Sequence, residues 1–291
     1  MDRDRDSLHR FLFEHTNVRG ELVHLDASWQ AVVERHQYPP VLRQLLGEAM
    51  AAVLLLGATI KYQGSIILQI QGNGPASLLV VQASAQRTVR GTVDWHGPVQ
   101  PGSLKDLFGR GHLAITIDPG QGAERYQGIV ELGDGGLAEA LEGYFQRSEQ
   151  LATRLWLAAD EHQAGGLLLQ RLPGKSDDPD VWNRAVHLGS TVTAGELLRL
   201  PFLEVVRRLF HEEDVRVFES EPVSFRCSCS REKIEDTLRG LGHGELLDIL
   251  AEQGTVGVDC NFCNQHYEFD AVDVEQLFAG GYSPGVPPTR H

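Results

Sequence analysis

The spacing of apolar residues in the first 175 positions predicts strands mixed with helices. Strands are predicted where polar and apolar residues alternate, or where β-branched residues gather between glycine turns, over 21–26, 65–71, 77–84, 88–94, 112–118, 125–131, 152–159 and 165–172. Helices are predicted over 27–36, 41–60 and 137–150. Many sequential strands with short turns favour a mainly antiparallel sheet packed with helices, an α+β fold.

The predicted helix over 41–60 is apolar almost all round, which indicates burial against a sheet. Its longest uninterrupted apolar run, 50–60, is too short to span a bilayer, so no membrane partner is expected. The glycines at 72 and 74 precede a strand rather than a helix. They therefore predict a turn and not a phosphate-binding loop.

A helical connector is predicted over 176–222. A polar break precedes a short helix over 181–188, and Thr193 with Glu196 resembles the capping sequence of another helix. An apolar face then follows, and we expect it to be docked on the first domain in the resting state. Seven of its residues are candidates for binding other proteins when the connector is released. These candidates are Leu197, Leu198, Phe202, Val205, Val206, Leu209 and Phe210.

All four cysteines of the chain lie in its last quarter, as Cys227, Cys229, Cys260 and Cys263. Two close thiol pairs separated by a short insert are typical of a closed zinc site with four sulfur ligands. His266 could replace one ligand, but four thiolates already complete a tetrahedron, so we expect it on the surface. The predicted organisation is thus a core domain over 1–175, the connector over 176–222 and a zinc-binding domain over 223–291.

Composition and charge narrow the function. The 291 residues are 42% hydrophobic and 23% charged, and the formal net charge is −14. Between positions 227 and 270 there are three cations against nine anions, which would repel a phosphate backbone. We therefore expect no nucleic-acid partner. No nucleotide-binding loop, nucleophile elbow or zinc-protease helix is present, so neither ATP-driven work nor enzyme activity is predicted.

Three interpretations of the thiols stay open at this point. The charged N-terminus lacks an apolar signal core, so a cytoplasmic location is expected, and structural disulfides are rare there. A thiol-exchange enzyme would need its Cys-x-x-Cys at a strand-to-helix turn, whereas residues after Cys263 alternate like a strand. A redox-released zinc lock and a constitutive zinc-stabilised adaptor both remain compatible with the pattern.

The motifs around the cysteines, from Phe225 to Arg231 and from Val258 to Tyr267, resemble the 33 kDa chaperonin family, as does the turn at 72–75 with the strand after it. These are bacterial redox-regulated holdase chaperones, and the resemblance spans essentially the whole chain. It implies one Zn²⁺ in the reduced form, which is monomeric and inactive. It also implies an oxidised, dimeric, ATP-independent holdase that binds unfolded proteins under oxidative or heat stress. Its disulfides would be Cys227–Cys229 and Cys260–Cys263.

The residues themselves support such a switch. The stretch between Cys229 and Cys260 is short and interrupted by glycines, so it is expected to need a metal to fold. Disulfides within each pair would close tiny loops and would not replace that metal. We therefore expect oxidation to expel zinc, melt the region and release the connector.

Overall fold

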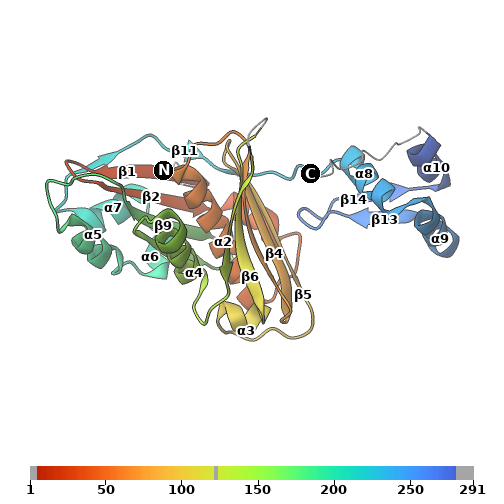
Figure 1. The fold of residues 1–291 in the computed structure, drawn as a ribbon, viewed down its shortest axis with the longest axis horizontal. Helices are drawn as coiled ribbons and strands as arrows, with labels where there is room; N and C mark the ends of the chain where they lie inside the picture. Colours follow the sequence, from red (N-terminus) through yellow and green to blue (C-terminus); the bar gives the residue numbers. More distant parts are fainter. Residues whose placement is uncertain (1–4, 121–123, 280–291) are drawn as a thin grey trace, which may run out of the picture. The chain divides into compact units, whose positions relative to one another are not determined.

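The computed structural model describes residues 5–120 and 124–279; the ends of the first and third predicted domains, 1–4 and 280–291, lie outside these ranges. The chain divides into two compact units, Met1–Arg226 and Cys227–His291. The first unit contains two six-stranded sheets, and the second, here called the cysteine unit, contains a two-stranded sheet with helices (Figure 1). The predicted α+β class is confirmed.

The first sheet has the order β10-β1-β2-β9-β8, with β11 also paired to β1. Its strands are β1 (Ser7–Phe13), β2 (Val18–Leu25), β8 (Thr153–Ala159), β9 (Ala164–Arg171), β10 (Val215–Val217) and β11 (Glu221–Pro222). The second sheet has the order β12-β5-β4-β3-β6-β7. Its strands are β3 (Ser65–Gly72), β4 (Ala76–Ser84), β5 (Thr88–Trp95), β6 (Gly111–Asp118), β7 (Tyr126–Glu131) and β12 (Ser224–Phe225). All pairings are antiparallel except that of β12 with β5.

Helix α2 (Pro40–Thr59) forms the centre of the first unit because it contacts β2, β8 and β9 of one sheet and β3, β4 and β5 of the other. Burial on both sides explains why the helix is apolar almost all round, as the sequence predicts. Three further helices precede β8 in the first unit: α1 (Ala27–Val33), α3 (Leu104–Phe108) and α4 (Leu137–Tyr144). Helix α4 continues into the π-helical turn η1 (Phe145–Glu149).

The sequence prediction concerned the uninterrupted apolar run over 50–60, whereas α2, the helix that contains this run up to Thr59, is longer. In the described residues α2 is the one helix long and apolar enough to cross a membrane by length and composition alone, since it runs on from Pro40. However, 78% of its most apolar stretch is buried inside the fold. The core helix of a folded domain passes the same test, so this helix is weak support for a membrane span.

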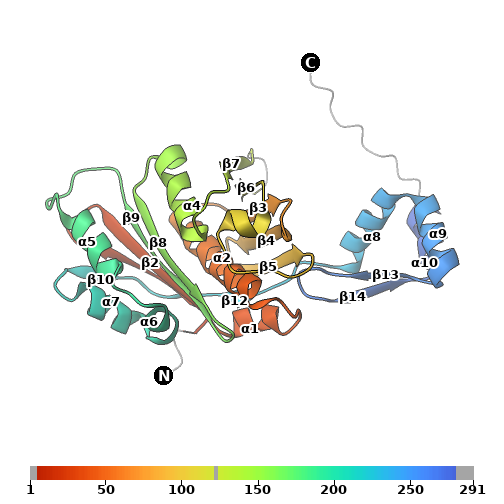
Figure 2. The ribbon, with the colours of Figure 1, turned by 90° about the horizontal axis from the view of Figure 1, so that it is seen from below.

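Three helices cover the outer face of the first sheet, and we call them the helical layer: α5 (Val181–Gly189), α6 (Ala194–Arg199) and α7 (Phe202–Phe210). Figure 2 shows them on the side of β2, β8 and β9 opposite to α2. Thr193 and Glu196 form the predicted capping box at the start of α6. The expected single apolar helix after Thr193 is instead two helices, because Pro201 lacks an amide hydrogen and α6 ends before it.

The cysteine unit contains α8 (Arg231–Leu241), α9 (His243–Gln253), β13 (Val256–Asp259), β14 (His266–Phe269) and α10 (Ala271–Ala279). Its fully buried core is small and consists of Leu238, Leu246, Val256, Phe269, Val274 and Leu277. A domain with so little apolar burial has little intrinsic stability, which makes any additional covalent or metal link important.

Candidate metal centre

Two pieces of backbone hold the four cysteines. Cys227 and Cys229 lie in extended chain before α8, whose first turn is capped by the Ser230 side chain. Cys260 and Cys263 lie in the tight loop between β13 and β14. The amides of Cys263 and of Asn264 both donate to the carbonyl of Cys260, at 3.3 and 2.7 Å. The loop closes because Asn264 adopts a left-handed φ of 57°, which asparagine tolerates better than most residues.

The structure brings all four predicted ligands together, with their sulfur atoms within 4.8 Å of one another. The Sγ atoms of Cys227 and Cys260 are 3.7 Å apart, and those of Cys229 and Cys263 are 3.4 Å apart. A tetrahedral site with Zn–S bonds of about 2.3 Å has sulfur–sulfur edges of about 3.8 Å. The donor set therefore fits a tetrahedral metal ion, and all four residues are free thiols rather than disulfides.

The surroundings of the thiols disfavour their charged form in the absence of a cation. Burial raises the pKa of Cys260, and burial followed by the hydrogen bond with Cys229 raises the pKa of Cys263. A divalent cation reverses this balance because it stabilises thiolates directly and releases their protons. The cluster is thus suited to holding a metal ion and poorly suited to holding several bare thiolates.

His266 lies at the surface, as expected. Its Nδ1 is 2.7 Å from Oδ1 of Asp259, and the side chain is not among the clustered ligand atoms. Tyr267, the next residue, has a role that the sequence analysis missed, because its hydroxyl donates to Sγ of Cys229 at 3.2 Å. Residues 267 and 269 share the inward face of β14. The alternation after the second cysteine pair was the available signal for this contact.

Arg231 connects three elements of the cysteine unit, and the sequence analysis did not identify it either. Its guanidinium donates to the carbonyl of Glu268 at 2.9 Å and forms an ion pair with Asp273 at 2.8 Å. It also lies 4.1 Å from the ring centroid of Phe269. One side chain therefore links α8, β14 and α10 two residues after Cys229.

The seven predicted client-binding residues lie on α6 and α7, on the face of the helical layer that packs against the first sheet, and each has 8% or less of its surface exposed. They pack on Phe11, Phe13 and Leu22 of the first sheet. Leu203, which follows Phe202 on the same helix, is 64% exposed. The docked state expected for this segment is the one observed.

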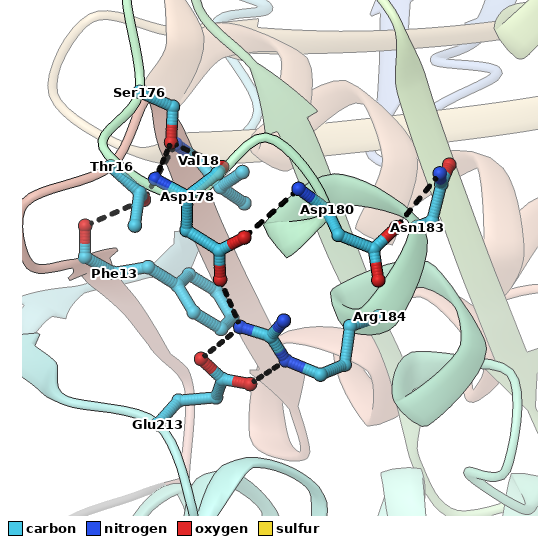
Figure 3. Close-up of polar contacts among 9 residues, drawn as sticks. All are labelled: Phe13, Thr16, Val18, Ser176, Asp178, Asp180, Asn183, Arg184 and Glu213. Atoms are coloured by element: carbon cyan, nitrogen blue, oxygen red, sulfur yellow. Dashed lines mark hydrogen bonds and ion pairs between the residues drawn. The ribbon is translucent and has the colours of Figure 1, made fainter.

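Polar contacts fix the ends of the helical layer (Figure 3). The guanidinium of Arg184 on α5 donates to Asp178 at 2.7 Å and to both carboxylate oxygens of Glu213 at 2.5 and 3.0 Å. These hydrogen bonds raise the pKa of Arg184 and lower that of Asp178. The segment before α5 and the segment after α7 are therefore joined through a single cation.

The model of the Hsp33 protein family matches residues 6–270. The 33 kDa chaperonin of Nitrosococcus oceani is 56% identical over 99% of both chains, and that of Methylobacillus flagellatus is 50% identical over 94% of both. The chain belongs to the Hsp33 family. The crystal structure of the Thermotoga maritima Hsp33 homolog has a TM-score of 0.81 at 25% identity, covering 94% of this chain and 97% of that one.

Membership makes the chain an Hsp33-type chaperone, and chaperones bind client proteins. Hsp33 relatives carry the name chaperonin, which implies a role other than catalysis. The predicted family resemblance is confirmed. In this Hsp33 structure the four clustered thiols form a possible metal site.

Proposed function

We propose that this protein is a redox-regulated, ATP-independent holdase of the cytoplasm, with one Zn²⁺ per chain in its reduced, inactive, monomeric form. The observation that carries the proposal is the convergence of four free thiols in a unit with a very small apolar core. Four sulfur ligands in a tetrahedral arrangement favour zinc over magnesium or calcium, which prefer oxygen. Tyr267 would hold Cys229 in place through its hydroxyl.

The metal would hold the cysteine unit together. It would link the chain before α8 to the loop between β13 and β14, two segments that are otherwise connected by a small core and by the polar contacts of Tyr267 and Arg231. Structural zinc in small domains contributes about 10–16 kcal/mol of apparent folding free energy at neutral pH. Loss of the metal would therefore melt the unit.

Oxidation would remove the ligands two at a time. Formation of each disulfide from two thiolates releases two electrons, which hypochlorous acid accepts, with one proton from solvent, as it becomes chloride and water. The proposed pairs are Cys227–Cys229 and Cys260–Cys263, although the sulfur–sulfur contacts of 3.7 and 3.4 Å in the reduced structure join Cys227 to Cys260 and Cys229 to Cys263. Bonds within each pair leave the two segments unlinked, whereas bonds between pairs would preserve the link. Mass spectrometry of peptides from oxidised protein distinguishes the two patterns, and cross-linked pairs would contradict the proposed switch.

Melting of the cysteine unit would leave the helical layer free to detach. Its buried face, with the sheet surface beneath, would then present a large apolar patch to unfolding proteins. The oxidised protein would act as a homodimer that keeps clients soluble for later refolding.

The decisive assay compares aggregation of a heat-denatured client in the presence of reduced, metal-loaded protein and of oxidised protein. Only the oxidised form should suppress light scattering, and equal activity of both forms would remove the switch. Turnover of a small disulfide substrate should be negligible; measurable turnover would favour a thiol-exchange enzyme. Retention of the metal after peroxide, with binding of one defined partner, would favour a constitutive adaptor.

A further inference from the structure

One extended segment, residues 215–226, runs along the edges of both large sheets, and we call it the strap. It contains β10, β11 and β12 and ends directly before Cys227. Its first two strands pair with β1, and its third pairs with β5. The strap therefore contacts one edge of each sheet of the first unit.

On the first sheet the strap forms hydrogen bonds with the backbone groups along the outer edge of β1. The amide of Phe218 donates to the carbonyl of Arg10 at 3.0 Å, and the amide of Glu14 donates at 2.8 Å to the carbonyl of Asp214, the residue directly before the strap. Because hydrogen-bonded pairs alternate in an antiparallel ladder, the Leu12 amide between them also faces the strap. Apart from the strap, the described strand paired with β1 is β2, on its other side.

On the second sheet the strap forms hydrogen bonds with backbone carbonyls along the outer edge of β5. The amides of Ser224 and Arg226 donate to the carbonyls of Arg87 and Val89, both at 3.2 Å. Here too the other described neighbour, β4, lies on the opposite side. Removing the strap would expose rows of unpaired backbone groups on both β1 and β5.

Besides these hydrogen bonds the strap is held by the ion pair of Arg216 with Glu14 at 3.0 Å, by the amide of Val223, which donates to the carbonyl of Asp6 at 2.7 Å, and by the Phe225 ring, which packs against the core. Its strands are only two or three residues long, and Val223 is its one side chain below 9% exposure in the described structure. Glu221 forms ion pairs with Arg10 and with Arg87, at 2.5 and 2.8 Å. The pair with Arg10, whose side chain is 46% exposed, contributes little to stability, whereas the Arg87 side chain is only 13% exposed. Detachment of the strap would break these contacts and would leave the pairings among the other strands of both sheets in place.

The opposite edge of the first sheet, formed by β8, is hydrogen-bonded by a side chain of the first unit and not by the strap. The amide of Leu155 on β8 donates to a carboxylate oxygen of Glu142, which comes from α4 within the core fold. That edge keeps its protection whether or not the strap is present. On the second sheet β7 is an edge strand with the strap in place, so binding there would not depend on strap release.

We propose that β1 and β5, once the strap leaves, bind extended segments of unfolded polypeptide by β-strand addition. The inference rests on the proposed holdase function and specifies how clients are held. The strap is itself an extended polypeptide seated on both edges, so each edge is already shaped for such an occupant. Main-chain hydrogen bonds require no particular client sequence, which suits a chaperone with many clients.

Amide hydrogen exchange of the oxidised, otherwise unaltered protein tests the proposal, with reduced and carboxymethylated α-lactalbumin as the unfolded client. The amides of Leu12 and Glu14 should exchange rapidly in the free oxidised protein and regain protection with client bound. The β7 amides serve as the internal reference. Unchanged exchange at Leu12 and Glu14, together with suppressed client aggregation, would overturn strand addition and leave the holdase function standing. Absence of any suppression would instead contradict the holdase function.

A matched pair of variants provides a second test. Leu12→Pro removes the amide hydrogen that faces the strap, and proline is tolerated at sheet edges. Leu12→Thr keeps the hydrogen and changes only the side chain. Leu12→Pro loosens the strap, so a simple exposure mechanism predicts stronger client binding. Strand addition predicts about tenfold weaker binding by the oxidised Leu12→Pro protein than by Leu12→Thr. Equal or stronger binding by a folded Leu12→Pro protein would contradict the proposal.

Discussion

The guanidinium of Arg184 and the carboxylate of Glu213 form a two-pronged ion pair across 29 residues of chain (Figure 3). Arg184 lies on the first helix of the helical layer, and Glu213 follows the last. The pair joins both ends of the segment whose detachment the proposed activity requires. If the layer detaches as proposed, this ion pair would have to break.

Replacement of Arg184 by leucine should loosen the helical layer in the reduced protein. Because the Arg184 side chain is 39% exposed, the expected loss is about 1 kcal/mol, or about fivefold faster amide exchange in α5 and α7. Arg207→Leu is the matched control, since it removes another cation from the layer at an exposed position. Equal exchange in both variants would show that the ion pair does not restrain the layer.

Phe202 should contribute much more to docking of the layer than its neighbour Leu203. The Phe202 side chain is 1% exposed, and its ring stacks on His9 with centroids 4.2 Å apart. Phe202→Ala should cost about 3–5 kcal/mol and increase binding of a hydrophobic dye by the reduced, metal-loaded protein. Leu203→Ala, at a position 64% exposed, should leave dye binding unchanged. A similar increase in both variants would contradict the docked arrangement.

Glu21 gives the first unit a pH-dependent stability. Burial raises the pKa of this carboxyl to about 7, and the charges of Arg19, Arg87 and Arg10 only partly offset that effect. The folded-state pKa lies above the ordinary value of 4.5, so the folded form holds the proton more tightly. Stability should therefore fall as pH rises from about 4.5 to 7 and stay lower above it.

Glu21→Gln should remove that loss and stabilise the first unit at pH 8 by about 3 kcal/mol, with little change at pH 4.5. Thermal unfolding at the two pH values measures the difference. Glu34→Gln, at an exposed position, is the control and should behave like the unaltered protein. Equal stabilisation of Glu21→Gln at both pH values would indicate a packing effect rather than a titration.

Replacing Cys227 and Cys229 together by serine should abolish metal binding. The cysteine unit should then lose its ordered structure and the reduced protein should bind hydrophobic dye constitutively. Ser228→Ala, between the two cysteines, leaves the donor set intact and should retain the metal. A tightly folded, metal-free double variant would contradict the stabilising role given to the metal.

Periodic elements could be predicted from the sequence, and elements that depend on distant contacts could not. The strands β3 to β5 and helix α2 lie within a residue or two of their predicted bounds, because their apolar patterns are long and bounded by glycine or proline. Strand β1 was missed because it is buried on both faces and carries histidine and arginine, so no alternation marks it. The strap strands are too short for any periodic signal.

The candidate site shows the same division. Thiol spacing alone identified all four residues that converge. The support from Tyr267 and Arg231 depends on how β14 and α8 pack, and local sequence does not specify that packing. The burial of the connector was expected from its apolar face, but the break at Pro201 was overlooked.

The central claim is that one metal ion on four thiols keeps the protein inactive until oxidation. Its most direct test is titration of freshly purified, reduced protein with hypochlorite, following zinc release and far-UV circular dichroism in parallel. We predict one zinc per chain at the start, and loss of helical signal in proportion to the zinc released, complete at two hypochlorite molecules per chain, one for each disulfide. No stoichiometric zinc in the reduced protein, or complete zinc release without loss of structure, would contradict the claim.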